Sequence, residues 1–133
     1  MEPRTHLAID RDLGGEPLAL AEGTARVRLR TTPRMRADER GLVHGAFVFG
    51  LADYAAMLAV NHPNVVLGAA EVRFLKPVVA GETLVAEAAI VGVQGRKRHV
   101  RVEVSREGGE AVFAGTFTCF APERHVLEPR TDG

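Results

Sequence analysis

Residues 41–61 read GLVHGAFVFGLADYAAMLAVN and form the longest apolar run of the chain. Residues 45–60 contain no proline and are rich in alanine, leucine and methionine, so the run predicts a helix. This helix is apolar on every side, and Asp53 is its only charged residue. Because it is shorter than the roughly twenty residues that cross a bilayer, we expect it to lie in the core of a globular domain.

Asp53 is the chemically unusual residue of this helix. At about 100° per residue it shares a stripe with Ala46, Gly50 and Met57, and the two small residues predict a groove along that stripe. An unpaired carboxylate in apolar surroundings costs several kcal/mol. We therefore expect Asp53 to have a partner, to face a wet cleft or to have a shifted pKa.

The groove leads to the start of the helix, at His44, Gly45 and Ala46. Backbone N–H groups at a helix start have no partner within the helix, and the helix dipole adds positive potential. An oxygen that carries negative charge is favoured there, so these residues outline an oxyanion site. The alternative is a structural role, in which Asp53 bonds a neighbouring loop or a second subunit.

The composition limits the class of protein. The 133 residues fit one domain, and a content of 46% hydrophobic and 26% charged residues is typical of a packed globular protein. A formal net charge of zero gives no general attraction to nucleic acid or to anionic membranes, so we expect neither partner. The first ten residues lack the pattern of a signal peptide, which makes the cytoplasm the expected location.

Other features of the composition are less specific. Arginine is abundant and amides are few, a pattern that fits a thermophilic source or a skewed nucleotide composition. The single cysteine, Cys119, excludes an internal disulfide, and its place in an alternating run predicts a buried packing residue.

Five segments have the alternating pattern of half-buried strands. They are residues 18–31, 65–77, 82–93, 98–106 and 110–120. Short turns join the last four segments, which predicts an antiparallel meander. Residues 1–17 have little pattern, and residues 122–133 are expected to be a C-terminal tail.

These elements predict an α+β fold in which an antiparallel sheet wraps around one long central helix, all within a single domain spanning residues 1–133. Asn61 and Pro63 mark the end of the helix. Asp38 and Glu39 precede its start, where we expect them to cap it. Because so few strands cannot enclose the helix, we expect dimerisation to complete the fold.

Several kinds of catalytic site have no counterpart in the sequence. There is no G-x-S-x-G motif and no glycine-rich phosphate loop, and the five histidines lack metal-ligand spacing, so we expect no metal site. Arg96, Lys97 and Arg98 form a basic cluster, and Lys76 lies at the end of another strand. These side chains form either a solvated turn or a phosphate clamp for a nucleotide-containing ligand.

Two motifs together resemble a known family. The segment HGAFVFGLADYAAMLAVN, in which Asp53 follows His44 by nine residues, and the segment RFLKPVVAGETLVAEAAIV are similar to the hotdog-fold acyl-CoA thioesterases. The sequence resembles in particular the phenylacetate-degradation type, with its HGG-x-x-x-x-L-A-D helix and its F-L-x-P…G-[DE] strand pair. The resemblance covers roughly residues 20–120. It implies a hotdog fold, a homodimer with a continuous sheet, and often a homotetramer.

The resemblance also implies roles for the residues singled out above. Asp53 of one subunit would act as general base or nucleophile. His44 and the helix start would come from the other subunit, where the N–H groups of Gly45 and Ala46 would polarise the thioester carbonyl. The substrate is implied to be an acyl-CoA or acyl-carrier-protein thioester, with no separate cofactor.

Three positions depart from the family pattern. Ala46 replaces the second glycine, Asp38 replaces an asparagine, and Tyr54 replaces a small residue, so the acyl pocket is expected to differ in shape and charge. Phe49, Met57 and Phe74 are candidate pocket walls or plain core residues. Because the superfamily also contains acyl-CoA sensors and dehydratases, a non-catalytic acyl-CoA-binding domain and a hydratase or dehydratase are the alternative functions.

Overall fold

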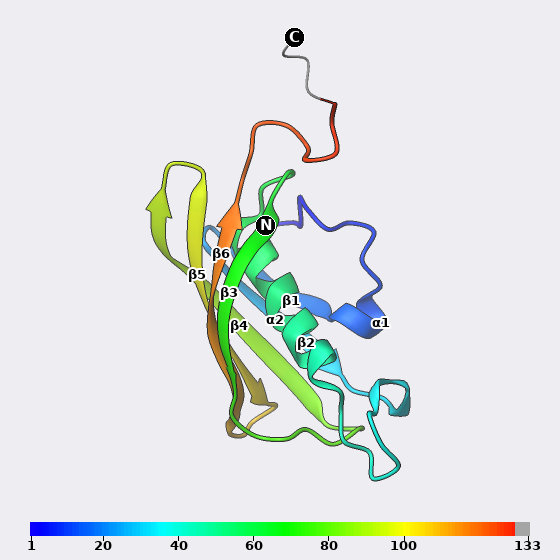
Figure 1. Cartoon of the computed structure of the whole chain (residues 1–133). Helices are drawn as coiled ribbons and strands as arrows, with labels where there is room; N and C mark the ends of the chain where they lie inside the picture. Colours follow the sequence, from blue (N-terminus) through cyan, green and yellow to red (C-terminus); the bar gives the residue numbers. More distant parts are fainter. Residues whose placement is uncertain (130–133) are drawn as a thin grey trace.

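The computed structural model describes residues 1–129, so the end of the expected tail, residues 130–133, lies outside the described residues. Nine elements follow one another along the chain. They are α1 (Arg11–Gly14), β1 (Glu16–Ala21), β2 (Thr24–Arg30), the 3₁₀ turn η1 (Pro33–Met35), α2 (Gly45–Val60), β3 (Val66–Phe74), β4 (Thr83–Gln94), β5 (Lys97–Arg106) and β6 (Ala111–Phe120). One antiparallel sheet has the strand order β1-β2-β4-β5-β6-β3, and α2 lies along its inner face (Figure 1). This is the predicted hotdog arrangement.

The central helix occupies the predicted residues. It begins after His44 and ends at Asn61, which adopts the left-handed conformation and donates its N–H to the carbonyl of Met57. Asparagine tolerates this conformation better than most residues, which explains the clean end. Within residues 1–129 no helix is both long and apolar enough to cross a membrane.

The middle strands follow the predicted alternation. On β2, Val27 and Leu29 are buried while the arginines that alternate with them are exposed at 26, 28 and 30. On β5, the valines at 100, 102 and 104 are buried. These side chains pack against α2, so the sheet covers the helix from one side. Apolar burial between the helix and these strands is the main stabilising term of the fold.

The order of the strands corrects two expectations. Residues 18–31, predicted as one strand, form the hairpin β1–β2 around Gly23, whose φ of 80° favours a glycine at this turn. The meander is also wrong at β3, which pairs with β6 and not with the next strand β4. Residues 75–82 cross from one edge of the sheet towards the other, and their length resembled an ordinary hairpin connection.

Strand β3 differs from the strands in the middle of the sheet. It is an edge strand, and most of its residues are exposed, including 56% of Phe74. An exposed edge with apolar side chains is a surface on which another strand can pair. The predicted dimer therefore has an available edge here, although the oligomeric state stays a prediction.

A small polar network fixes the crossing segment 75–82. Glu82 accepts the N–H of Val79 at 2.7 Å and the Nε–H of Arg106 at 2.7 Å, and Arg106 also donates to the carbonyl of Pro77 at 2.6 Å. The N–H of Val79, with a smaller contribution from Arg106, lowers the pKa of Glu82. The network places this segment beside the residues that precede α2, where the N–H of Val43 reaches the carbonyl of Val78 at 2.8 Å.

Asp38 does not cap α2 as expected. Its Oδ1 accepts the N–H groups of Arg40 and Leu42 at 3.0 and 3.1 Å, so it closes its own loop. Aspartate side chains in loops often accept hydrogen bonds from backbone N–H groups a few residues further on, because these groups are nearer than the N–H groups at the helix start.

Candidate active site

The carboxylate of Asp53 lies on α2 where the inner face of the helix meets a cavity. Its Oδ1 is buried and has no hydrogen-bond partner among residues 1–129. Burial raises the pKa of Asp53 to about 6. A buried oxygen without a partner is costly, so it marks either a strained position or a group reserved for a ligand.

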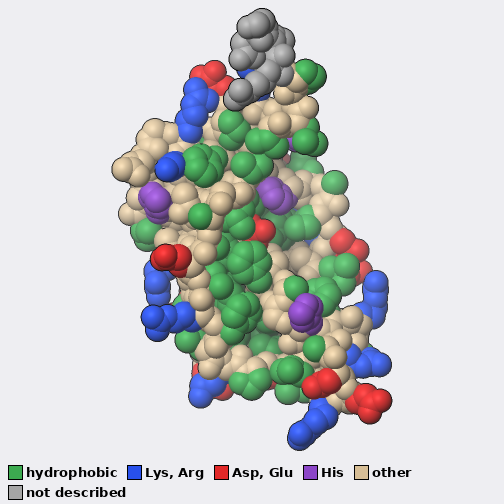
Figure 2. Space-filling model, viewed as in Figure 1, with side chains coloured by type: hydrophobic (Ala, Val, Ile, Leu, Met, Phe, Trp, Pro, Cys, Tyr) green, Lys and Arg blue, Asp and Glu red, His purple; other side chains and the backbone are tan. Residues whose placement is uncertain are grey.

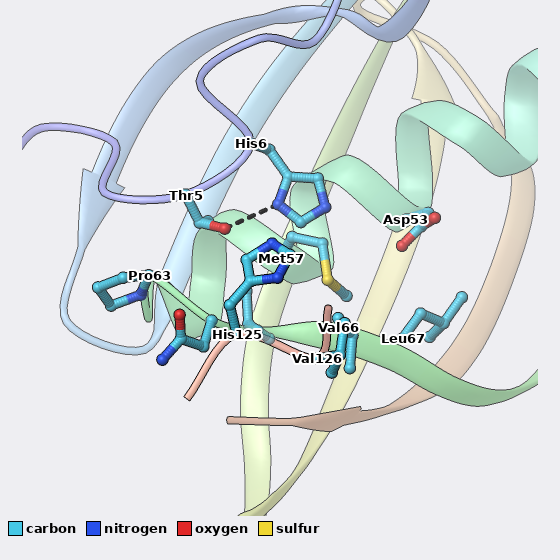
Figure 3. Close-up of a pocket in the computed structure, with 11 residues that line it drawn as sticks. Thr5, His6, Asp53, Met57, Pro63, Val66, Leu67, His125 and Val126 are labelled. Carbon is cyan, nitrogen blue, oxygen red and sulfur yellow. Dashed lines mark hydrogen bonds between the residues drawn. The ribbon is translucent and has the colours of Figure 1, made fainter. Parts of the chain in front are cut away.

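The cavity next to Asp53 has a volume of about 360 Å³. Its apolar wall comes from the end of α2, the start of β3 and the segment between them, and includes Met57, Val65 and Leu67. Its polar wall comes from both ends of the described chain, with Thr5 and His6 on one side and His125 on the other (Figure 3). Asp53 is therefore part of a mixed polar and apolar cavity of ligand size.

The start of α2 forms a second and separate part of the site. His44 is the N-cap residue, its side chain makes no capping hydrogen bond, and both His44 and Ala46 are exposed. The first N–H groups of a helix have no intrahelical acceptor, and this applies to those of Gly45 and Ala46. A cavity of about 240 Å³ reaches Gly45 and is also lined by Phe74 and Lys76.

These two parts cannot act on one bond within a single chain. Gly45 and Asp53 are eight residues apart on one helix, which is about 12 Å along the axis at 1.5 Å per residue. A base and an oxyanion donor must both lie about 3 Å from the reacting groups. The two parts therefore lie too far apart within one chain to contact the same reacting group.

The predicted pocket walls differ in their positions. Met57 lines the Asp53 cavity, and Phe74 lines the cavity at the helix start, where its ring lies against Gly45. Phe49 packs against Phe117 with ring centroids 5.4 Å apart, inside the aromatic core. Tyr54 is buried and lines neither cavity. Their roles in substrate binding stay predictions, as does that of Asp38.

The basic cluster lies at the turn between β4 and β5, outside both cavities. Arg96 forms an ion pair with Glu123 at 2.7 Å, Lys97 lies 5.5 Å from the ring centroid of Phe120, and Arg98 donates to carbonyls of its own turn. Each cation already has a neighbour, so a phosphate would have to compete with these contacts.

Cys119 is buried, as its place in the pattern predicted. Burial, with a smaller contribution from the charge of Asp53, raises the pKa of its thiol to about 12. Because a thiol acts as a nucleophile only after deprotonation, Cys119 is a packing residue next to the carboxylate. No group of three or more His, Cys, Asp or Glu side chains that could hold a metal ion occurs in residues 1–129.

Sequence reasoning missed the polar wall of the Asp53 cavity. His6 and His125 lie in segments without periodic pattern, so nothing in the sequence linked them to Asp53. The two histidines come together at the cavity only when the chain has folded, because they are far apart in the sequence. In the orientation of Figure 1, hydrophobic side chains lie along the centre of the visible surface, and Lys and Arg side chains lie along its edges (Figure 2).

Two solved structures have the same fold as this chain. An uncharacterised protein of Pyrococcus horikoshii is 55% identical, with a TM-score of 0.94 and coverage of 96% of this chain and 98% of that chain. A variant of the phenylacetic acid degradation protein PaaI of Thermus thermophilus is 34% identical, with a TM-score of 0.75 and coverage of 83% and 95%.

Two curated relatives are longer proteins. The methylthioribose-1-phosphate isomerase of Aquifex aeolicus is 51% identical over 117 residues, which are 88% of this chain and 25% of that protein. Transcription factor FapR of Caldanaerobacter subterraneus is 28% identical over 124 residues, which are 93% of this chain and 58% of that protein. The chain thus spans only part of either relative.

The thioesterase superfamily model matches residues 40–113, which include the helix start, Asp53, strands β3, β4 and β5, and the start of β6. The match covers more than half of the chain and contains both halves of the candidate site. Together with the sheet order, the central helix and the likeness to PaaI, it shows that this chain belongs to the thioesterase superfamily of hotdog-fold proteins.

Proposed function

We propose that the protein hydrolyses the thioester of an acyl-CoA or acyl-carrier-protein substrate. The observation that carries the proposal is the buried Oδ1 of Asp53, which has no partner among residues 1–129 and faces a cavity. A pKa of about 6 leaves most of this carboxyl ionised at pH 7, yet keeps it basic enough to accept a proton from water. Membership of the family supports the choice of a thioester.

In this mechanism Asp53 has one of two roles. As general base, it takes a proton from a water molecule whose oxygen attacks the thioester carbonyl carbon. As nucleophile, its own oxygen attacks that carbon and water later hydrolyses the anhydride. In both cases negative charge develops on the carbonyl oxygen, and the N–H groups of Gly45 and Ala46 are suited to stabilise it.

We further propose that these N–H groups come from a second copy of the chain. The separation of about 12 Å between Gly45 and Asp53 on one helix supports this, as does the exposed edge of β3. A dimer formed at this edge, or a tetramer of two such dimers, would bring the helix start of one protomer near the Asp53 cavity of its partner.

A panel of acyl-CoA thioesters tests the proposal through release of free thiol. The wild type should turn over at least one member, and Asp53→Asn should lower kcat/KM by roughly 10²–10⁴, the usual contribution of a general base. Asparagine keeps the shape of the side chain, so a loss reflects chemistry and not packing. A decrease of only a few-fold would contradict the assignment of Asp53.

A non-catalytic acyl-CoA sensor is the second candidate function. It is favoured by the match to FapR, a transcription factor, over 93% of the chain. The same panel distinguishes the two candidates, because a sensor would bind acyl-CoA tightly without releasing thiol. Crotonyl-CoA should be included, since its hydration would identify the third alternative, a hydratase.

A further inference from the structure

We infer that His6 is a second catalytic residue of this site, where its Nε2 makes a hydrogen bond to the water that attacks the thioester. The inference rests on the proposed hydrolysis. His6 lies outside the residues matched by the family, 40–113, and enters the site only through the fold of the N-terminal segment.

The imidazole of His6 is directed into the cavity that contains Asp53. Figure 3 shows the ring reaching over Met57 towards the side where Asp53 lies. Its Nδ1 is 2.8 Å from the Oγ1 of Thr5, which is buried and fixes the ring from behind. The Thr5 contact uses one ring nitrogen and leaves Nε2 for a group in the cavity.

The segment that carries His6 is attached to the helix that carries Asp53. The N–H of Arg4 donates to Oδ1 of Asn61 at 2.7 Å, and the side-chain amide of Asn61 donates to the carbonyl of Glu2 at 3.0 Å. Asn61 is the residue at which α2 ends, so its side chain links the segment that carries His6 to the helix that carries Asp53. Such support is what a catalytic group needs to keep its geometry.

The backbone of His6 also departs from ordinary geometry. Its φ is 55°, in the left-handed region that costs a residue other than glycine roughly 1–2 kcal/mol. A backbone in this region is often found where a side chain has to be directed into a functional site. Burial lowers the pKa of His6, so the neutral ring prevails at pH 7 and can donate or accept one hydrogen bond.

The chemistry requires no net proton transfer to His6. The water oxygen bonds to the carbonyl carbon while one of its protons moves to Asp53, and the C–S bond then breaks as Asp53 returns that proton to the departing thiolate. The products are a carboxylic acid and a thiol. According to the tautomer, Nε2 of His6 either donates to the water oxygen or accepts the second proton of the water, and in both cases at least one lone pair of the oxygen stays free for the attack.

His125 lines the same cavity but is a weaker candidate. It is exposed, and its Nδ1 accepts the N–H of Leu127 at 3.0 Å within its own segment. His6 is half-buried and tied to α2 through the contacts of its segment with Asn61, so its position relative to Asp53 is better defined.

The test compares kcat and KM of the wild type, His6→Ala, His6→Gln and His99→Ala on the best acyl-CoA. Loss of one hydrogen bond to the reacting water should lower kcat about ten-fold in His6→Ala, with KM nearly unchanged. His6→Gln should recover most of kcat, because its amide nitrogen can replace Nε2. His99 lies beside Thr118 outside the cavity, so His99→Ala should match the wild type.

The outcomes separate this inference from the proposed function. Wild-type kcat in both His6 variants, while Asp53→Asn is inactive, overturns the role of His6 alone, and so does a change confined to KM. A wild type that hydrolyses no thioester overturns the proposed function and with it the inference. If His6→Ala fails to fold, the ¹⁵N shift of His6 Nε2 on binding a non-hydrolysable acyl-CoA analogue decides, because an unmoved signal excludes His6 from the site.

Discussion

The two halves of α2 have similar apolar sequences but differ in burial. In the second half, every residue from Tyr54 to Ala59 is buried, and Asp53 lies at the edge of that region. In the first half, Val48 and Leu51 are buried while Ala46 is exposed. The sheet of one chain therefore covers the second half of the helix better than the first.

This difference separates the two chemical parts of the proposed site. The buried half supplies a carboxylate with a raised pKa, and the exposed half supplies backbone N–H groups and His44. Each half has one of the two chemical functions that thioester hydrolysis needs, and the helix keeps them about 12 Å apart. A second copy that covers the exposed half would supply the missing function.

Mixing two inactive variants gives the largest expected effect. His44→Ala alters only the exposed half of the site, and Asp53→Asn only the buried half, so a hybrid dimer should contain one intact site and one doubly altered site. Random exchange gives hybrids in half of the dimers, and activity should rise from near zero to roughly a quarter of the wild type if His44 is needed. Thiol release after exchange measures it.

The control is verified subunit exchange, for example by mass difference between labelled chains. Exchange without recovery of activity would reject a site shared between the halves of two helices. A monomer by light scattering at micromolar concentration would reject the assembly itself.

The pH dependence of activity should report only the buried half. Because Asp53 must be ionised to accept a proton and has a pKa of about 6, kcat/KM should fall about ten-fold per pH unit well below pH 6 and level off above it. His6 and His125 also line the cavity, so the profile should be repeated with His6→Gln and His125→Gln. An acid limb that is unchanged in both variants is assigned to Asp53, and a limb that moves in either variant is assigned to that histidine.

The helix, its end and the unusual surroundings of Asp53 could be predicted from the sequence, because they depend on local patterns. The alternation on β2 and β5 likewise predicted which valines face the core. The site residues Asp53, His44, Gly45 and Ala46 were singled out by spacing on one helix, and their catalytic roles stay predictions. Local patterns of this kind reflect the immediate surroundings of a residue.

Features that depend on distant segments could not be predicted. The pairing of β3 with β6 follows from the crossing segment held by Glu82 and Arg106, and a short connection looks the same whether it turns back or crosses. The segment that carries His6 is held in place by hydrogen bonds between Asn61 and the backbone of Glu2 and Arg4, and Asn61 is 57 positions away from Arg4. No periodicity connects such residues.

The buried half should also affect stability with pH. Asp53 has a pKa near 6 when folded and about 3.8 when unfolded, so the folded protein binds more protons between these values. The contribution of Asp53 to the free energy of unfolding therefore falls as pH rises from about 4 to 6 and stays unfavourable above pH 6. Because the side chain is only half-buried, we expect the free energy of unfolding to fall by about 1–2 kcal/mol over this range.

Denaturant unfolding of the wild type and Asp53→Asn at fixed protein concentration measures this contribution. The difference in unfolding free energy between the two proteins should grow in favour of Asp53→Asn as pH rises from 4 to 7. A constant difference would mean that Asp53 has an ordinary pKa in the folded protein.

The smallest expected effect comes from loosening the exposed half alone. Arg106→Gln removes the contacts to Glu82 and Pro77 that hold the segment beside the helix start, while the Asp53 cavity keeps all its lining residues. The loss of partly buried hydrogen bonds should lower stability by about 1 kcal/mol. It should also lower kcat/KM a few-fold, because the N–H groups of Gly45 and Ala46 become less well placed, and the acid limb of the pH profile should not move.

Arg26→Gln is the matched control, since its ion pair with Glu87 is exposed and an exposed pair contributes less than about 1 kcal/mol. Equal effects of the two variants on kcat/KM would show that the network around Glu82 does not position the helix start.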